Sequence, residues 1–380
     1  MTPALMTGST VRAPRTLRNR LSRMAEAATT PLVPADYLDL VAPLRSGTDL
    51  RARIVAVQPE TRDAATIVLK PGADWAGHVP GQYLRIGIDV DGVREWRAYS
   101  LTHGPRSDGL ISITVKAVPD GKVSRHLVHD ARPGTLVHLE QAAGDFVLDE
   151  RPGKLLFVTA GSGVTPVIGM LRNLFPVTDS GVLRLRRSED LDITVVHVAP
   201  SEPDSIFLDN LRALAADGAI TLIARYDDQH GVLDVSDLSG LVPDLAERTT
   251  YACGPGGLLD ALTAHHEAAG LDLFTEQFRA GFVSAGEGGT LTVAGITVAA
   301  DGATPLLDVA EAAGALMPSG CRMGVCFGCV LPLTEGAVRD LRNGAITTAD
   351  PISSGAGGVP IQTCINAAAG ACTLGEKATR

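Results

Sequence analysis

Three cysteines near the end of the chain are spaced for iron binding. Cys321, Cys326 and Cys329 form a C-x4-C-x2-C run, and Cys364 follows at a distance. This order of thiols is the plant-type ligand pattern of a [2Fe–2S] cluster. Glycines between the cysteines would let a tight loop fold around the inorganic core and direct its N–H groups at sulfur. The spacing therefore predicts a centre that accepts one electron at a time.

Zinc and a disulfide are the chemical alternatives. Structural zinc sites usually pair two short knuckles, and only one C-x2-C half is present here. Six cysteines, four of them in a metal-type arrangement, suit a reducing compartment better than a disulfide framework. For the fourth ligand we prefer Cys364, since Ile361–Ile365 reads as a short apolar strand able to present one side chain to a buried cluster. Cys372 reads instead as a small apolar residue.

A second candidate site is a strand that carries Arg97, Tyr99 and Ser100. Alternation along a strand places Arg97 and Tyr99 on one face and Ser100 on the other, where the strand ends. A guanidinium can fork onto phosphate, a phenol ring can stack on a flat heterocycle, and a hydroxyl can bond a ring nitrogen. An ordinary half-exposed strand could also carry these residues.

A possible anion site follows downstream, at Gly121, Lys122, Val123 and Ser124. We expect Ser124 to cap a short helix whose free N–H groups face an anion. A capped surface helix without a ligand is an equally good interpretation.

Glycine turns end two of the expected parallel strands. Gly161, Gly163 and Thr165 lie between a buried strand and a helix, and Cys253, Gly254 and Pro255 end a later strand. Both turns would line one crevice at the carboxyl edge of the sheet, where open α/β sheets bind ligands. The first turn is not the full G-x-G-x-x-G fingerprint, so it is only moderately specific for a dinucleotide.

The choice between NADPH and NADH rests on the ends of two strands. Glu202, just after the second parallel strand, favours the ribose hydroxyl of NADH. Arg225, at the end of the third, could meet the 2′-phosphate of NADPH. We favour NADPH.

Charge and composition limit the other function classes. The formal net charge of −10 argues against non-specific binding to nucleic acid, which needs a basic surface. No apolar run approaches the length of a membrane span and no secretory h-region is visible, so we expect a cytoplasmic protein. Five arginines between residues 12 and 23 predict a basic helix. That helix would pack on the protein's own body or dock at a partner or membrane surface.

Apolar periodicity divides the chain into modules, with residues 1–47 as a basic N-terminal extension. Short alternating strands predict an antiparallel β-barrel over residues 48–150. Buried apolar runs alternating with helical stretches predict a doubly wound α/β domain over residues 151–279. A Gly/Ser/Glu-rich linker is expected at residues 280–289. A hairpin, a helix and the metal loop predict a compact α+β unit over residues 290–380.

The expected strands can be compared with the structure one by one. Those of the barrel are Leu50–Val57, Ala65–Lys70, Gln82–Asp89, Arg94–Leu101, Leu110–Ala117 and Thr135–Glu140. Those of the parallel sheet are Lys154–Ala160, Leu191–Ala199, Ala219–Ala224, Thr249–Cys253 and Leu271–Phe278.

In this order, the Arg97–Ser100, Gly121–Ser124, Gly161–Pro166 and Cys253–Pro255 motifs, followed by the plant-type cysteines, resemble the ferredoxin-NADP reductase superfamily. More narrowly, residues 48–380 look like the reductase components of oxygenases and acyl desaturases that end in a β-grasp [2Fe–2S] domain. A softer likeness over residues 31–37 points to the actinobacterial branch that serves stearoyl-CoA desaturases.

The resemblance implies FAD as a second cofactor. It implies that Arg97 binds the FAD phosphate, Tyr99 covers the isoalloxazine ring and Ser100 lies near its N5 atom. The segment Gly121–Ser124 would then hold the diphosphate.

The resemblance also implies a path for the nicotinamide. Gly161, Gly163 and Thr165 would shape the NAD(P) channel, and the Cys253–Pro255 turn would face the nicotinamide. Phe278, in a Glu-x-Phe sequence at the end of the last parallel strand, would cover the flavin. Tyr99, Ser100 and Cys253 are therefore the residues expected at the reaction centre.

Three functions are compatible with these observations. The first is a reductase that passes electrons from NADPH through FAD and the cluster to a fatty acyl-CoA desaturase, with docking at a membrane surface through that acceptor. The second gives the same electrons to a ring-hydroxylating or other oxygenase. The third, from another class, is a redox sensor whose cluster reports oxidation without turnover. The sequence does not determine the oligomeric state.

Overall fold

The structure is a computed structural model of the chain. It describes residues 41–90, 93–119, 121–148, 153–178, 181–182, 191–278, 286–320, 322, 324, 327–350 and 358–375. The basic segment at residues 12–23, the segment 31–37, Cys321 and Cys326 lie outside these ranges.

The first module is the antiparallel barrel that the sequence predicts. Its strands follow the order β4-β3-β6-β1-β2-β5, and a bridge between Leu101 and Ile113 joins the two ends of this order. Ile54, Ile67 and Leu84 point into a fully buried apolar core, as alternation along the strands requires. The strands are β1 (Arg51–Thr61), β2 (Ala64–Pro71), β3 (Tyr83–Val90), β4 (Val93–Ser100), β5 (Ile111–Lys116) and β6 (Leu136–Leu139).

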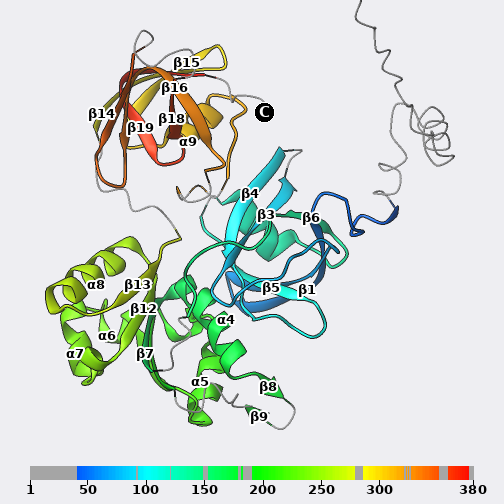
Figure 1. The fold of residues 1–380 in the computed structure, drawn as a ribbon, viewed down its shortest axis with the longest axis vertical. Helices are drawn as coiled ribbons and strands as arrows, with labels where there is room; N and C mark the ends of the chain where they lie inside the picture. Colours follow the sequence, from blue (N-terminus) through cyan, green and yellow to red (C-terminus); the bar gives the residue numbers. More distant parts are fainter. Residues whose placement is uncertain are drawn as a thin grey trace, which may run out of the picture.

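The second module is a five-stranded parallel sheet with the order β11-β10-β7-β12-β13. Helices α4 and α5 cover one face, and α7 and α8 cover the other (Figure 1). The third strand starts two residues later than expected and ends at Tyr226, so Arg225 lies inside it. The strands are β7 (Lys154–Ala160), β10 (Asp192–Ala199), β11 (Thr221–Tyr226), β12 (Thr249–Cys253) and β13 (Leu273–Glu276). The helices are α4 (Val164–Leu174), α5 (Leu208–Ala216), α6 (Asp227–His230), α7 (Leu238–Leu241) and α8 (Gly256–Ala269).

Shorter elements complete this module. A small hairpin pairs β8 (Val177–Thr178) with β9 (Gly181–Val182). The 3₁₀ turns are Gly161–Gly163, Glu202–Asp204, Val235–Asp237 and Leu245–Glu247.

The third module is a mixed sheet with the order β15-β14-β19-β16-β17, and β18 pairs with β16. Helix α9 packs on it through Leu306, Leu307 and Ala310. The expected hairpin is present, and its turn at Ala294 and Gly295 has positive φ at both residues, as a tight two-residue turn needs. The elements are β14 (Gly286–Val293), β15 (Ile296–Gly302), α9 (Leu306–Ala312), β16 (Val330–Asp340), β17 (Ile346–Ala349), β18 (Val359–Gln362) and β19 (Asn366–Leu374).

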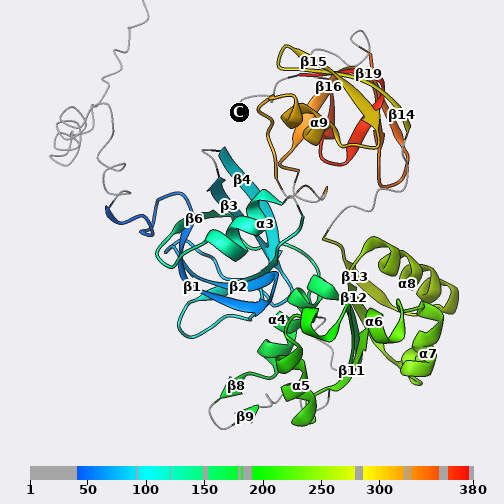
Figure 2. The same cartoon turned by 180° about the vertical axis from the view of Figure 1, so that it is seen from behind.

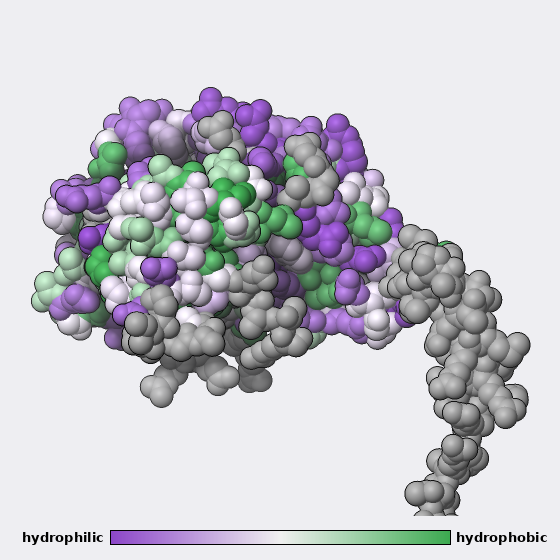
Figure 3. Space-filling model, turned by 90° about the horizontal axis from the view of Figure 1, so that it is seen from above, coloured by the Kyte–Doolittle hydropathy of each residue, from purple (hydrophilic) through white to green (hydrophobic). Residues whose placement is uncertain are grey.

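The expected linker is shorter than the sequence indicates. Residues 286–289 belong to β14, where they pair with β15 and β19. The ferredoxin-like sheet, uppermost in Figure 1, shows a surface of mixed hydropathy when seen from above (Figure 3). Within the described ranges, no helix has the length and apolar character that crossing a bilayer requires.

Helix α4 joins the first module to the second. A Cβ atom at Gly169 would overlap the carbonyl oxygen of Leu101, so the helix backbone lies directly against the chain leaving β4. Arg172 donates a hydrogen bond to the carbonyl of Thr102 over 3.1 Å. The absence of a side chain at Gly169 therefore sets how closely the two modules pack.

We expect Gly169→Ala to lower the free energy of unfolding by about 1–3 kcal/mol, because the added methyl group has backbone rather than a movable side chain in its way. Gly240→Ala in α7 is the matched control, since nothing lies within 4 Å of a Cβ atom there. That control should be neutral or slightly stabilising. Urea denaturation followed by circular dichroism measures both, and equal midpoints for the two variants would contradict the packing argument.

Candidate functional site

Strand β4 carries the first group of predicted residues, Arg97, Tyr99 and Ser100. The Tyr99 ring packs against the barrel core, and this burial raises the pKa of its hydroxyl above the usual range. Ser100 is buried at the end of the strand. The Arg97 guanidinium donates to Glu95 over 3.1 Å and to the carbonyl of Trp96 over 2.8 Å. The strand thus offers a neutral aromatic ring, a hydroxyl and a cation along one short stretch.

Helix α3 (Lys122–Arg125) begins after Gly121, and a π-helical turn (His126–Asp130) continues it. The prediction that Ser124 caps this helix is wrong, because Gly121 is the N-cap and no side chain caps the helix. Ser124 lies inside the helix, where its hydroxyl donates to the Gly121 carbonyl and accepts from the Val118 N–H. Val123 is buried in the barrel core, whereas Lys122 is exposed. Lys122 therefore remains available to an anion.

The two glycine turns of the parallel sheet meet back to back. A Cβ atom at Gly163 would overlap the carbonyl oxygen of Cys253, and Gly161 has a positive φ of 54°. The Thr165 hydroxyl donates to the Ser162 carbonyl over 3.0 Å, which holds the first turn. Pro255 is the N-cap of α8. The sequence correctly placed both turns at the carboxyl edge of one sheet.

Cys253 lies beside a carboxyl group that we did not predict as a site residue from the sequence. Cys253 pairs with Glu276 across strands β12 and β13. Burial, and to a lesser extent Glu276, raises the pKa of the Cys253 thiol, so it stays protonated at neutral pH. Burial and nearby Asp145 raise the pKa of Glu276 to about 7. Phe278, two residues on, packs partly buried against the core of the α/β module.

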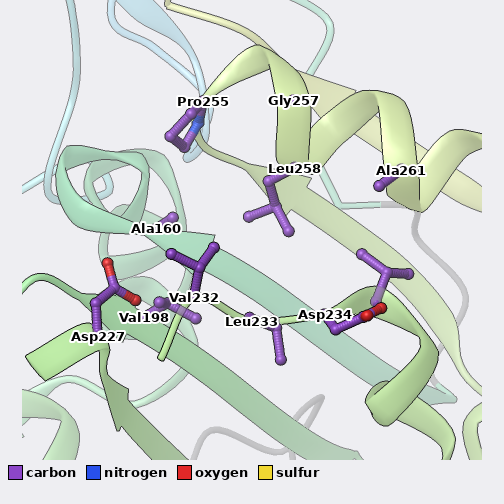
Figure 4. A pocket seen from close by; sticks show the side chains of 11 residues that line it. Ala160, Val198, Asp227, Val232, Leu233, Asp234, Pro255, Gly257, Leu258 and Ala261 are labelled. Atoms are coloured by element: carbon purple, nitrogen blue, oxygen red, sulfur yellow. The ribbon is translucent and has the colours of Figure 1, made fainter. Parts of the chain in front are cut away.

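A cavity of about 600 Å³ opens at the same edge of the sheet (Figure 4). Its walls include Ala160, Val198 and Leu258, with Asp227 and Asp234 at opposite ends in the view. Within the described residues, one buried oxygen of Asp227 has no hydrogen-bond partner. Sequence reasoning missed Asp227, although it lies only two residues after Arg225.

The charged residues at the ends of β10 and β11 differ in whether they already have partners within the protein. Arg225 makes a hydrogen bond of 3.4 Å to the carbonyl of His230, and its buried Nε has no partner in the described part of the chain. Glu202 is already paired with Arg212 of α5. The carboxylate that the sequence suggests for a ribose hydroxyl is therefore engaged within the protein.

Two of the four expected metal ligands lie in described parts of the structure, and they are neighbours. The Thr363 hydroxyl and N–H both donate to the carbonyl of Cys329, at 2.9 and 3.3 Å, and Cys364 is the next residue. Cys329 and Cys364 are both buried in the core of the third module. Cys364 lies in the turn after β18 rather than in a strand, which corrects the sequence-based expectation.

Cys372 lies elsewhere. It is six residues beyond Asn366 along the extended strand β19, so roughly 20 Å of strand separates it from the turn at Cys364, at about 3.3 Å per residue. Burial raises the pKa of the Cys372 thiol to about 11. Of the cysteines that the structure describes in this module, Cys329 and Cys364 therefore lie together at one end, and Cys372 does not lie with them.

Comparisons with known proteins agree with this arrangement. Residues 52–148 match the oxidoreductase FAD-binding domain family, and residues 291–368 match the 2Fe-2S iron-sulfur cluster binding domain family. The chain is 44% identical to an NADPH oxidoreductase of Mycobacterium tuberculosis, over 93% of this chain and 91% of that protein. It is 27% identical to the ferredoxin reductase component of a 3-ketosteroid-9-alpha-monooxygenase of Mycolicibacterium smegmatis, over 79% of this chain and 90% of the relative.

A solved structure shares the fold of the three modules. The structure of phthalate dioxygenase reductase, described as modular for electron transfer from pyridine nucleotides to [2Fe–2S], matches with a TM-score of 0.57 at 20% identity. The match covers 85% of this chain and 97% of that one. The chain therefore belongs to the NAD(P)H-dependent oxidoreductases that join FAD-binding and NAD-binding modules to a C-terminal [2Fe–2S] ferredoxin domain.

Proposed function

We propose that this chain takes a hydride from NADPH and supplies single electrons, through its cluster, to the iron centre of an oxygenase component. The observation that carries the proposal is the joint placement of the two back-to-back glycine turns and the Cys329–Cys364 neighbourhood in one chain. FAD supplies the chemistry that links the two ends, because a flavin accepts two electrons at once and gives them up singly. A redox sensor that works without turnover would not need a crevice for a nucleotide.

The proposed flavin contacts follow from β4 and α3. The Tyr99 ring is neutral and partly exposed above the barrel core, so it can cover a flat heterocycle. Ser100 supplies a hydroxyl at the strand end. Arg97 and exposed Lys122 supply positive charge for phosphate oxygens, with Gly121, Val123 and Ser124 shaping the start of α3.

The proposed nicotinamide contacts lie where the glycine turns meet. Gly161, Gly163 and Thr165 form one wall of this site, where Gly163 lies directly against the carbonyl of Cys253. Gly254 and Pro255 continue the wall into the N-terminus of α8. Cys253 is fully buried and burial keeps its thiol protonated, so this residue adds no charge behind the proposed nicotinamide position. An uncharged wall excludes water without stabilising a competing ion.

The proposed cluster ligands are Cys321, Cys326, Cys329 and Cys364. We expect Cys364→Ser protein, purified without oxygen, to lose almost all its iron and acid-labile sulfide, because the replaced thiol stands beside Cys329. Cys372→Ser is the matched control and should keep its wild-type iron content. Both variants should still oxidise NADPH with ferricyanide, whereas only the control should reduce cytochrome c. Iron loss in Cys372→Ser with full iron in Cys364→Ser would reverse the assignment.

NADPH is favoured over NADH by the charges at the strand ends. Glu202 is paired with Arg212, while the Nε of Arg225, two residues before Asp227 of the cavity wall, has no partner in the described part of the chain. Asp227 works against a 2′-phosphate, so Arg225 must outweigh it. The 44% identical relative bears the name NADPH oxidoreductase, which supports the same choice.

We expect Arg225→Ala to raise the KM for NADPH roughly tenfold to hundredfold, because the variant loses a hydrogen bond to a charged phosphate. The KM for NADH should stay nearly unchanged. Arg94→Ala removes an equal charge that is paired with Asp89 on the barrel, and it should change the ratio of the two KM values little. Steady-state reduction of ferricyanide provides both constants. Equal effects of Arg225→Ala on the two coenzymes would remove Arg225 from phosphate recognition.

The acceptor is proposed from the relatives. Reductase components of 3-ketosteroid and glycine betaine monooxygenases are among them, the latter 26% identical over 71% of this chain. The likeness to the electron-transfer partners of desaturases stays a prediction from the sequence. A desaturase, like an oxygenase, would also need single electrons for its iron.

Reconstitution of the purified reductase with the oxygenase component of 3-ketosteroid-9-alpha-monooxygenase, and in parallel with an acyl-CoA desaturase in vesicles, tests the acceptor. We expect NADPH-dependent product with the oxygenase. The desaturase should give at least tenfold less product per cluster, which corresponds to a free-energy difference of about 1.4 kcal/mol in favour of the oxygenase. The opposite ratio would make the desaturase the acceptor.

A further inference from the structure

The segment around Cys321, which we call the cluster loop, contacts the β-barrel of the first module, which we call the flavin module. These contacts lie on both sides of Cys321 in the sequence. Ser319 precedes this ligand by two residues and Arg322 follows it directly. The carbonyl of Ser319 accepts a hydrogen bond from Arg85 of β3 at 3.5 Å. Arg322 lies 3.8 Å from a carboxylate oxygen of Glu95 on β4. Figures 1 and 2 both show the chain after α9 approaching the ends of β3 and β4.

The Arg85 side chain is held firmly on the flavin side. Its guanidinium binds both carboxylate oxygens of Glu140, at 2.6 and 2.7 Å, and lies 5.2 Å from the centre of the Trp96 ring. Only 10% of the side chain is exposed. A cation whose Nη1 donates to both oxygens of a carboxylate, and which lies over an aromatic ring, loses little further freedom when its Nη2 donates to Ser319.

The Arg322 side chain is held equally firmly on the cluster side. It pairs with Asp308 and Glu311 of α9, each at 2.6 Å. Its backbone has a positive φ of 59°, a conformation that costs free energy for a side-chain-bearing residue. The ion pairs to α9 offset that cost and aim the guanidinium at β4.

Glu95 is shared between the two modules. The same oxygen, Oε2, lies 3.1 Å from Arg97 and 3.8 Å from Arg322, and 12% of the Glu95 side chain is exposed. One largely buried carboxylate thus faces two cations, one of which is proposed to bind the FAD phosphate. When Arg97 engages phosphate, Glu95 remains for Arg322.

We propose that Glu95 and Arg85 are positioning residues that dock the cluster loop on the flavin module by holding Arg322 and Ser319 on either side of Cys321. The proposal rests on the electron path proposed above and adds the contact that fixes the gap between the two redox centres. Electron transfer falls steeply with such a gap. Loosening the contact therefore slows reduction of the cluster, while the rate at which NADPH reduces the flavin stays unchanged.

Stopped-flow mixing of the full-length holoprotein with NADPH under anaerobic conditions separates these two steps by their absorbance changes. We expect Arg322→Met and Glu95→Gln to slow cluster reduction about tenfold, since removing one partner of a largely buried ion pair shifts an equilibrium by at least this factor. Arg322→Lys keeps the charge and should restore most of the rate. Asp89→Asn is the matched control, because this exposed carboxylate on the same hairpin pairs with Arg94 rather than with the third module.

Hydrogen exchange provides a readout that does not depend on turnover. Amides of residues 83–100 and 315–330 should exchange faster in Arg322→Met and Glu95→Gln, and at the wild-type rate in Asp89→Asn. Flavin content is measured first, because Glu95 also pairs with Arg97. If Glu95→Gln has lost FAD, the rates in Arg322→Met and Arg85→Met test the proposal instead. Wild-type cluster reduction and exchange in flavin-replete Arg322→Met would overturn the proposal. Failure of NADPH to reduce the flavin of the wild-type protein would overturn the proposed function instead.

Discussion

The closeness of helix α4 to two other backbones is the constraint on which the nucleotide and flavin sites depend. At its start, Gly163 leaves no room between the helix and the carbonyl of Cys253, and at its middle, Gly169 does the same with Leu101. The first contact joins α4 to the end of β12, and the second joins it to the chain leaving β4. The residues proposed to meet nicotinamide and flavin are therefore placed relative to one another through a single helix, by backbone contacts that cannot repack.

Strand β4 carries this placement on to the third module. Its last residues supply Tyr99 and Ser100, its exit contacts α4, and its middle supplies Glu95 to the cluster loop. Because adjacent residues of a strand face opposite ways, one strand can serve a buried contact and an outward ion pair at the same time. The three modules are far apart in the sequence, yet they converge on this strand.

Local patterns predicted much of this, and contacts between modules account for what they missed. Alternation and apolar runs placed all eleven strands expected in the first two modules, since burial of one face or both leaves a period in the sequence. Ser124 was misjudged because residue preference alone does not reveal that Gly121 ends the extended chain. Asp227, Glu95 and Arg322 have no signature at all. Their importance comes from partners that lie in other modules or across a cavity, and no spacing rule connects those positions.

The strengths of the ion pairs around the cluster loop bear on whether the third module stays docked. Arg322 lies 2.6 Å from its partners on α9 but 3.8 Å from Glu95, which it also shares with Arg97. The weaker pair is the one between modules, so salt and competition act on it first. Salt should therefore weaken the contact between the cluster loop and β4 before it weakens the pairs of Arg322 with Asp308 and Glu311, which stay within the third module.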